Sequence, residues 1–206
     1  MPKRFPRPRF SALALAALVA GCAAARPLPA DLVTGYGPRP DRFQVCHGYG
    51  CRLSDHVRLS AADWISVRAA FAPPAADAAA ERRRIAAAVA LLERLSAPWA
   101  GTGDDGAEAH FLSGGPGQMD CVDETLNTTT YLVMMADDGL LRWHRPGRPA
   151  RRGRLVDGTW PHNTAVIEER ATGRAWAVDA YFHANGQPPD IVPLDRWLAG
   201  WRPRGS

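Results

Sequence analysis

The stretch Gly117-Gln118-Met119-Asp120-Cys121-Val122-Asp123-Glu124-Thr125-Leu126 joins an irregular Gly/Pro segment to a helical pattern that runs to residue 136. Asp120 is a favourable N-cap, and Asp123, three residues later, resembles the acidic partner of a capping box. Cys121 then lies in the first helical turn, where unpaired amide groups and the helix dipole favour a thiolate. Cys121 is therefore a candidate nucleophile; the alternative is a small buried hydrophobic residue, a common role of free cysteine.

Two strands with a hairpin between them are predicted after this helix, over residues 160–168 and 174–181. The connecting loop ends at Gly173, where a left-handed residue is needed. His162 lies near the start of the first strand. Asp179 lies on the second, otherwise apolar strand, where an unpaired carboxylate would be costly. His162 is therefore the expected partner of Asp179.

The length of the hairpin loop decides whether this pair can form. A two-residue turn would place Asp179 opposite Val166, too far from His162 for a hydrogen bond. A four-residue loop over residues 170–173 places Asp179 opposite Thr164 and makes it the diagonal neighbour of His162, roughly 7–8 Å away between backbones. A four-residue loop centred between Arg170 and Ala171 would place the two residues directly opposite each other. The pair therefore requires the wider hairpin.

The order of these motifs resembles a known superfamily. A cysteine that opens a helix (MDCVDETLNTTTYL) is followed by a histidine that begins a strand (PHNTAVIE) and an aspartate on the next strand (AWAVDAYF). This order is similar to that of the transglutaminase-like and papain-like superfamily, and most of all to the bacterial transglutaminase-like cysteine peptidases. The likeness covers residues 115–183, and Val122 departs from the acidic residue of the family's Asp-Cys-Glu-Asp motif.

The resemblance implies a Cys121–His162–Asp179 triad. Cys121 would attack an acyl carbon, His162 would transfer the proton, and Asp179 would fix the tautomer and orientation of the imidazole. The Cys121 backbone N–H would bind the oxyanion, with Gln118 as the candidate second donor. The other histidines are His144 and His183, which are rivals for the base, and His47, His56 and His110, which are expected in surface loops.

The N-terminus resembles a bacterial lipoprotein signal. A basic start is followed by an apolar run, Phe10–Ala20, that is too short to span a bilayer, and then by Gly21-Cys22. The resemblance implies cleavage before Cys22 and lipid attachment to its thiol; an ordinary secretory signal is the alternative. Ala23-Ala24 lacks the acidic residue linked to inner-membrane retention, so we expect an outer-membrane anchor facing the periplasm.

The remaining chain divides into a Pro/Ala-rich tether, residues 22–40, and one domain, residues 41–206. The whole chain has 25 Lys and Arg against 21 Asp and Glu, but four of the basic residues and no acidic ones lie in the signal, so 21 remain on each side. The mature protein thus lacks the basic footprint that a nucleic-acid-binding protein needs.

Two of the four cysteines lie close together, in Cys46-His-Gly-Tyr-Gly-Cys51. In an exported protein this spacing indicates a disulfide that closes a small loop. The alternative is a zinc site that uses both sulfurs with His47 or His56. Cys121 is left as an odd thiol in an oxidising compartment, which favours a functional role for it.

The other predicted elements place helices in the N-terminal half and an antiparallel sheet in the C-terminal half, an α+β fold with a transglutaminase-like core. Capping and spacing predict helices over residues 60–71 and 75–96, and residues 188–201 read as a loop and a short helix. The basic stretch Arg142–Arg154 is read as an exposed strand and loop, with an anion-binding edge as the alternative.

These expectations lead to one functional hypothesis and its rival. The first is an envelope lipoprotein whose cysteine site hydrolyses amide or peptide bonds through a thioester, with transamidation as a variant. Its substrate would be a peptide or protein, and the chemistry needs no metal or organic cofactor. The rival is a catalytically inactive lipoprotein that uses the same fold as a binding or scaffolding module.

Overall fold

The computed structural model describes residues 37–108, 115–153 and 160–204. The expected signal peptide, Cys22, most of the tether, His110 and Arg154 lie outside these residues. The described part is a mixed α+β fold with antiparallel sheets, as the sequence predicts. No helix in that part is long and apolar enough to cross a bilayer.

The larger sheet is built around the strand that begins at His162. Its strand order is β3-β5-β6-β7, and β4 pairs with the same edge of β5 as β3 does, nearer the start of β5. Every pairing is antiparallel. The strands are β3 (His144–Pro146), β4 (Ala150–Arg152), β5 (His162–Glu169), β6 (Ala175–Asp179) and β7 (Asp190–Pro193).

The β5–β6 hairpin has the wider loop. Glu168 pairs with Ala175 and Ala165 with Val178, and the same register continued by one residue places Thr164 opposite Asp179. Glu169 closes the loop, because its amide donates to the carbonyl of Arg174 at 2.8 Å. Of the loop lengths considered, the four-residue loop is therefore confirmed.

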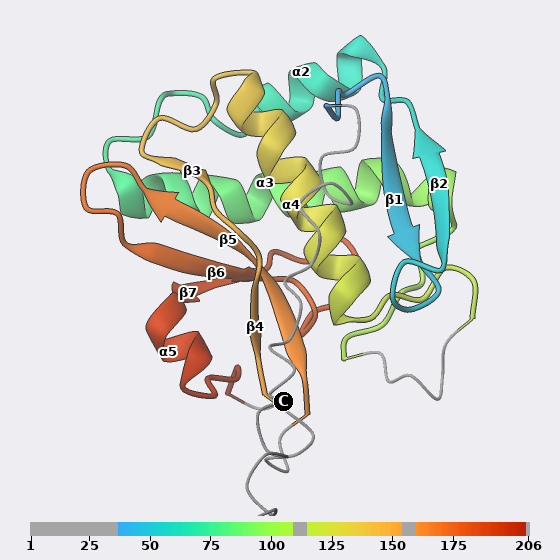
Figure 1. The fold of residues 1–206 in the computed structure, drawn as a ribbon. Helices are drawn as coiled ribbons and strands as arrows, with labels where there is room; N and C mark the ends of the chain where they lie inside the picture. Colours follow the sequence, from blue (N-terminus) through green and yellow to red (C-terminus); the bar gives the residue numbers. More distant parts are fainter. Residues whose placement is uncertain (1–36, 109–114, 154–159, 205–206) are drawn as a thin grey trace, which may run out of the picture.

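Helix α4 (Cys121–Asp137) lies at the centre of the fold, between the larger sheet and a separate hairpin of β1 (Phe43–His47) and β2 (Leu53–Val57) (Figure 1). Its polar residues are buried with the apolar ones, because threonine hydroxyls donate to carbonyls one turn back, as Thr129 does to Thr125 at 2.6 Å. The remaining helices are α2 (Ala61–Ala69), α3 (Ala78–Ala100) and α5 (Leu194–Leu198).

Two elements differ from the sequence prediction. Helix α3 ends four residues later than expected, although it contains Pro98, because Gly101 at φ 64° forms a left-handed C-cap whose amide bonds the carbonyl of Ala97. Part of the expected loop after residue 188 is strand β7, which pairs with β6 along the sheet edge. The β1–β2 hairpin has little sequence signal, since four of the five residues of β2 are exposed.

Candidate active site

Cys121 is the first residue of α4 and has a free, partly exposed thiol. The capping box predicted from the sequence is present: the Asp120 carboxylate accepts the amides of Val122 and Asp123 at 2.9 and 3.0 Å. The Asp123 carboxylate in turn accepts the Asp120 amide at 3.1 Å. The cap fixes the start of the helix and with it the position of Cys121 in the first turn.

His162 connects Cys121 to Asp179. Its Nε2 lies 2.8 Å from Asp179 Oδ2, and the Cys121 thiol also hydrogen-bonds the imidazole. Because Nε2 is used by the carboxylate, Nδ1 is the nitrogen that is left for the sulfur. Burial alone would lower the pKa of His162, but hydrogen bonds to Asp179 and Cys121 and their negative charges outweigh it and raise the pKa to about 9. The imidazole is therefore charged at neutral pH.

Trp197 is a member of this site that the sequence did not single out. Its indole Nε1 donates to Asp179 Oδ2 at 2.6 Å, and its fully buried ring lies 5.4 Å from the His162 ring. Tyr181 and Phe182 also contact the His162 ring, with centroids 4.9 and 5.2 Å away. The carboxylate thus accepts two N–H donors, and the imidazole is held among aromatic rings. A tryptophan in a short C-terminal helix carries no local signal for this role.

The side-chain amides of Asn163 and Gln118 differ in what they contact. Asn163 Nδ2 lies 3.5 Å from Cys121 Sγ. Gln118, the residue expected at the oxyanion, instead has its Nε2 3.0 Å from the carbonyl of Asp104 and its Oε1 3.5 Å from the amide of Gly106. Asn163 follows His162 directly in the sequence, and that adjacency was its only sequence signal.

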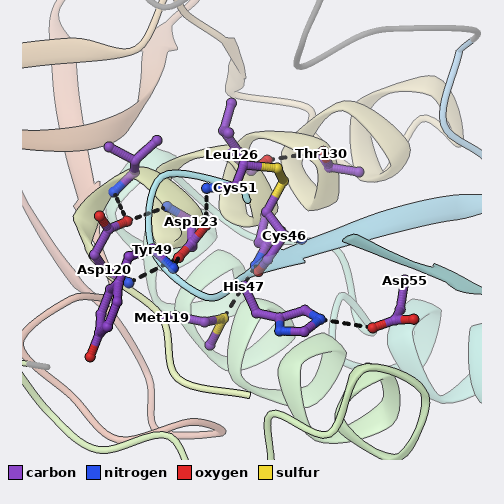
Figure 2. The surroundings of a disulfide bond; sticks show 12 residues. Cys46, His47, Tyr49, Cys51, Asp55, Met119, Asp120, Asp123, Leu126 and Thr130 are labelled. Atoms are coloured by element: carbon purple, nitrogen blue, oxygen red, sulfur yellow. Dashed lines mark hydrogen bonds and ion pairs between the residues drawn. A yellow bond between two sulfur atoms is a disulfide. The ribbon is translucent and has the colours of Figure 1, made fainter. Parts of the chain in front are cut away.

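The predicted Cys46–Cys51 disulfide is confirmed, and its loop packs against the start of α4 (Figure 2). The Asp123 carboxylate accepts the amides of Tyr49 at 2.9 Å and Cys51 at 2.6 Å, in addition to the Asp120 amide of the capping box. Three backbone amides, two of them from the disulfide loop, thus form a small anion-binding nest around the carboxylate. Because both sulfurs are in the disulfide, the zinc alternative loses two of its ligands.

His47 is not a surface residue, which corrects the sequence expectation. It is 4% exposed, its Nε2 bonds Asp55 at 2.8 Å, and its Nδ1 accepts the amide of Gly117 at 3.1 Å. Gly117 itself lies so close to Gly101 that an added Cβ would be 2.2 Å from that residue's carbonyl oxygen. The disulfide loop, the end of α3 and the segment before Cys121 are therefore locked together.

Opening the disulfide is expected to weaken this lock. In a Cys46→Ser/Cys51→Ser variant, we expect the free energy of unfolding to fall by about 2 kcal/mol, the value for so short a loop. The Asp123 nest also loses its covalent constraint. Urea unfolding of the variant and of wild type with and without reductant measures the effect. An unchanged midpoint in both comparisons would contradict the structural role of the disulfide.

A cluster of buried carboxyl groups lies behind the thiol. Glu93 of α3, Asp105 and Glu124 of α4 are each 4% exposed. Burial raises the pKa of Glu93 to about 8 and that of Asp105 to about 7, and it also raises the pKa of Glu124. Glu124 and Asp105 hydrogen-bond each other, and Glu93 accepts the amide of Gly186 at 2.7 Å. The cluster therefore holds protons at neutral pH.

The two rival histidines have acidic partners of their own. His144 is fully buried, with Nδ1 3.0 Å from Glu81, and His183 Nε2 lies 2.8 Å from Asp190.

Two arginines of the basic stretch Arg142–Arg154 contact other side chains of the domain. Arg145 pairs with Glu168 at 2.8 Å, and the Arg152 guanidinium lies 4.3 Å from the Trp197 ring centroid.

Comparison of the chain with protein families, with curated proteins and with solved structures finds no match.

Proposed function

We propose that Cys121, His162 and Asp179 form a catalytic triad that transfers acyl groups from amide or peptide bonds through a thioester. The observation that carries the proposal is the position of the His162 imidazole, which bonds the Asp179 carboxylate through Nε2 at 2.8 Å and also bonds the Cys121 thiol. A charged imidazole beside a thiol at a helix N-terminus is the environment that favours a thiolate nucleophile.

The reaction has two halves, formation and breakdown of the thioester, and His162 gives up a proton in the first and takes one up in the second. The Cys121 sulfur forms a bond to the acyl carbon, and the carbonyl electron pair moves onto oxygen. When that pair returns, the carbon–nitrogen bond breaks and the departing amine takes the proton from His162. Water then attacks the thioester while His162 removes its proton, and the thiolate leaves. Where an amine replaces this water, the same intermediate gives transamidation.

The arrangement of elements supports a transglutaminase-like core for this domain. The cysteine opens α4, which packs against β5, and the histidine and aspartate come from the antiparallel pair β5 and β6. This order agrees with the resemblance stated above for residues 115–183. The fold class alone would not carry an activity, so the proposal is based on the site.

We further propose that the domain works in the bacterial cell envelope, anchored through Cys22 to the outer membrane and facing the periplasm. Support comes from the lipoprotein-like N-terminus and from the Cys46–Cys51 disulfide, a bond typical of oxidising compartments. The substrate would be a peptide or protein of that compartment.

Selective alkylation tests the triad. Iodoacetamide at pH 5.5 reacts slowly with an ordinary thiol, of which roughly one part in a thousand is ionised at that pH. We expect rapid alkylation of Cys121 in wild type, read by peptide mass mapping, and its loss in His162→Ala. His183→Ala is the matched control, because it removes another histidine that bonds an aspartate at 2.8 Å. Slow alkylation in wild type, or equal rates in all three proteins, would favour the inactive binding module.

A further inference from the structure

The Cys121 sulfur has a second side-chain neighbour besides the imidazole. Asn163 Nδ2 approaches it to 3.5 Å from a residue that is 8% exposed. Neighbouring side chains on an extended strand point in different directions. The amide of Asn163 and the imidazole of His162 therefore reach the sulfur from different sides, and the donor does not compete with the base.

This position suits a group that binds an oxyanion. The oxyanion forms on the carbon that the sulfur attacks, so its donors must lie beside the sulfur and about 3 Å from the oxygen. The first amides of a helix have no intrahelical acceptor, so the Cys121 N–H, at the first position of α4, is a candidate for one of the donors. Gln118 is less suited, because its amide already bonds the backbone at Asp104 and Gly106.

We infer that Asn163, through its Nδ2–H, is the second oxyanion donor of this site and acts with the Cys121 N–H. The inference rests on the proposed function and assigns to Asn163 the role expected of Gln118. Asn163 is then a catalytic residue that touches the reacting atoms. It stabilises the negative charge on the acyl oxygen while the carbon–sulfur bond forms and until the leaving group departs.

Two reactions of the Cys121 sulfur distinguish oxyanion binding by Asn163 from an effect of Asn163 on the reactivity of the thiol itself. Acylation by p-nitrophenyl acetate passes through an oxyanion: the sulfur bonds the acetyl carbon and p-nitrophenolate leaves. Alkylation by iodoacetamide displaces iodide directly and forms no oxyanion. We expect Asn163→Ala and Asn163→Val to slow acylation of Cys121 by about 100-fold or more. Both variants should alkylate within about fivefold of wild type, since a neutral hydrogen bond to the thiolate has only a modest effect.

The outcomes are read on the mature protein, with the rate in Cys121→Ser subtracted as background. Asn163→Val is included because valine favours strands and fills more of the space of asparagine than alanine does. It serves as the folded variant if Asn163→Ala loses both reactions. Acylation within about fivefold of wild type in either folded variant overturns the inference. A larger loss of acylation in Gln118→Ala than in Asn163→Ala also overturns it. Slow reaction of wild-type Cys121 with both reagents would instead remove the proposed function, and the inference with it.

Discussion

Asp179→Asn is expected to slow acylation of Cys121 by about 10⁴-fold, the loss seen when the aspartate of such a triad becomes an amide. The Asp179 carboxylate is 1% exposed and accepts two N–H donors at one oxygen, from His162 and Trp197. An amide in its place offers one acceptor and one donor, so it can hold the imidazole in the wrong tautomer. It also withdraws the negative charge that helps to keep the pKa of His162 near 9.

The pH dependence gives this prediction a second readout. With Asp179 replaced, the pKa of His162 should fall toward its ordinary value near 6.5, so the imidazolium that stabilises the thiolate is lost above that pH, and iodoacetamide should alkylate Cys121 more slowly at neutral pH than in wild type. Asp190→Asn is the matched control, because Asp190 pairs with Asp179 across β6 and β7 and also bonds a histidine at 2.8 Å. Equal acylation rates in Asp179→Asn and Asp190→Asn would show that the carboxylate does not act through His162.

The parts of the site that local rules govern could be predicted from the sequence. The N-cap Asp120 and its partner Asp123 are spaced as a capping box, and the structure has both hydrogen bonds. The period of two along strands made the position of Asp179 relative to His162 depend only on the length of the hairpin loop. Asp179 is the one carboxylate on an otherwise apolar strand, and its need for a partner pointed to His162 on the neighbouring strand.

The parts that depend on distant segments could not be predicted. Trp197 reaches Asp179 only because β7 adds to the sheet edge and turns directly into α5, and neither its short strand nor its short helix has a strong pattern. His47 precedes the glycine-rich segment Gly48-Tyr49-Gly50, which reads as an exposed loop. Its side chain is nevertheless buried and accepts the amide of Gly117, a residue distant in the sequence. The buried carboxyl groups come from α3, α4 and the loop between them, and each one alone reads as a surface residue of its own segment.

Glu93→Gln is expected to stabilise the protein at pH 9 by on the order of 3 kcal/mol and to leave it little changed at pH 5. The pKa of Glu93 is raised from 4.5 to about 8, mainly by burial and further by the charge of Asp105. Glu124 of α4 also faces this group, and it interacts in turn with Asp105, Asp123 and Asp179. The folded state therefore binds a proton that the unfolded state has released, and stability falls as pH rises from about 4.5 to about 8. Glutamine has no proton to lose.

A second glutamate of the same helix provides a control of opposite sign. Glu81 is 1% exposed; burial would raise its pKa, but hydrogen bonds from His144 and from the backbone amides of residues 142–144 outweigh burial and lower the pKa. Its contribution to stability is thus present above its unfolded pKa and is lost as pH falls through the folded value. Glu81→Gln should destabilise the protein by at least about 1 kcal/mol at pH 9, because one acceptor oxygen replaces two. Urea unfolding at pH 5 and pH 9 measures both variants against wild type. If Glu93→Gln were also less stable than wild type at pH 9, the buried carboxyl cluster could not be the source of the pH dependence.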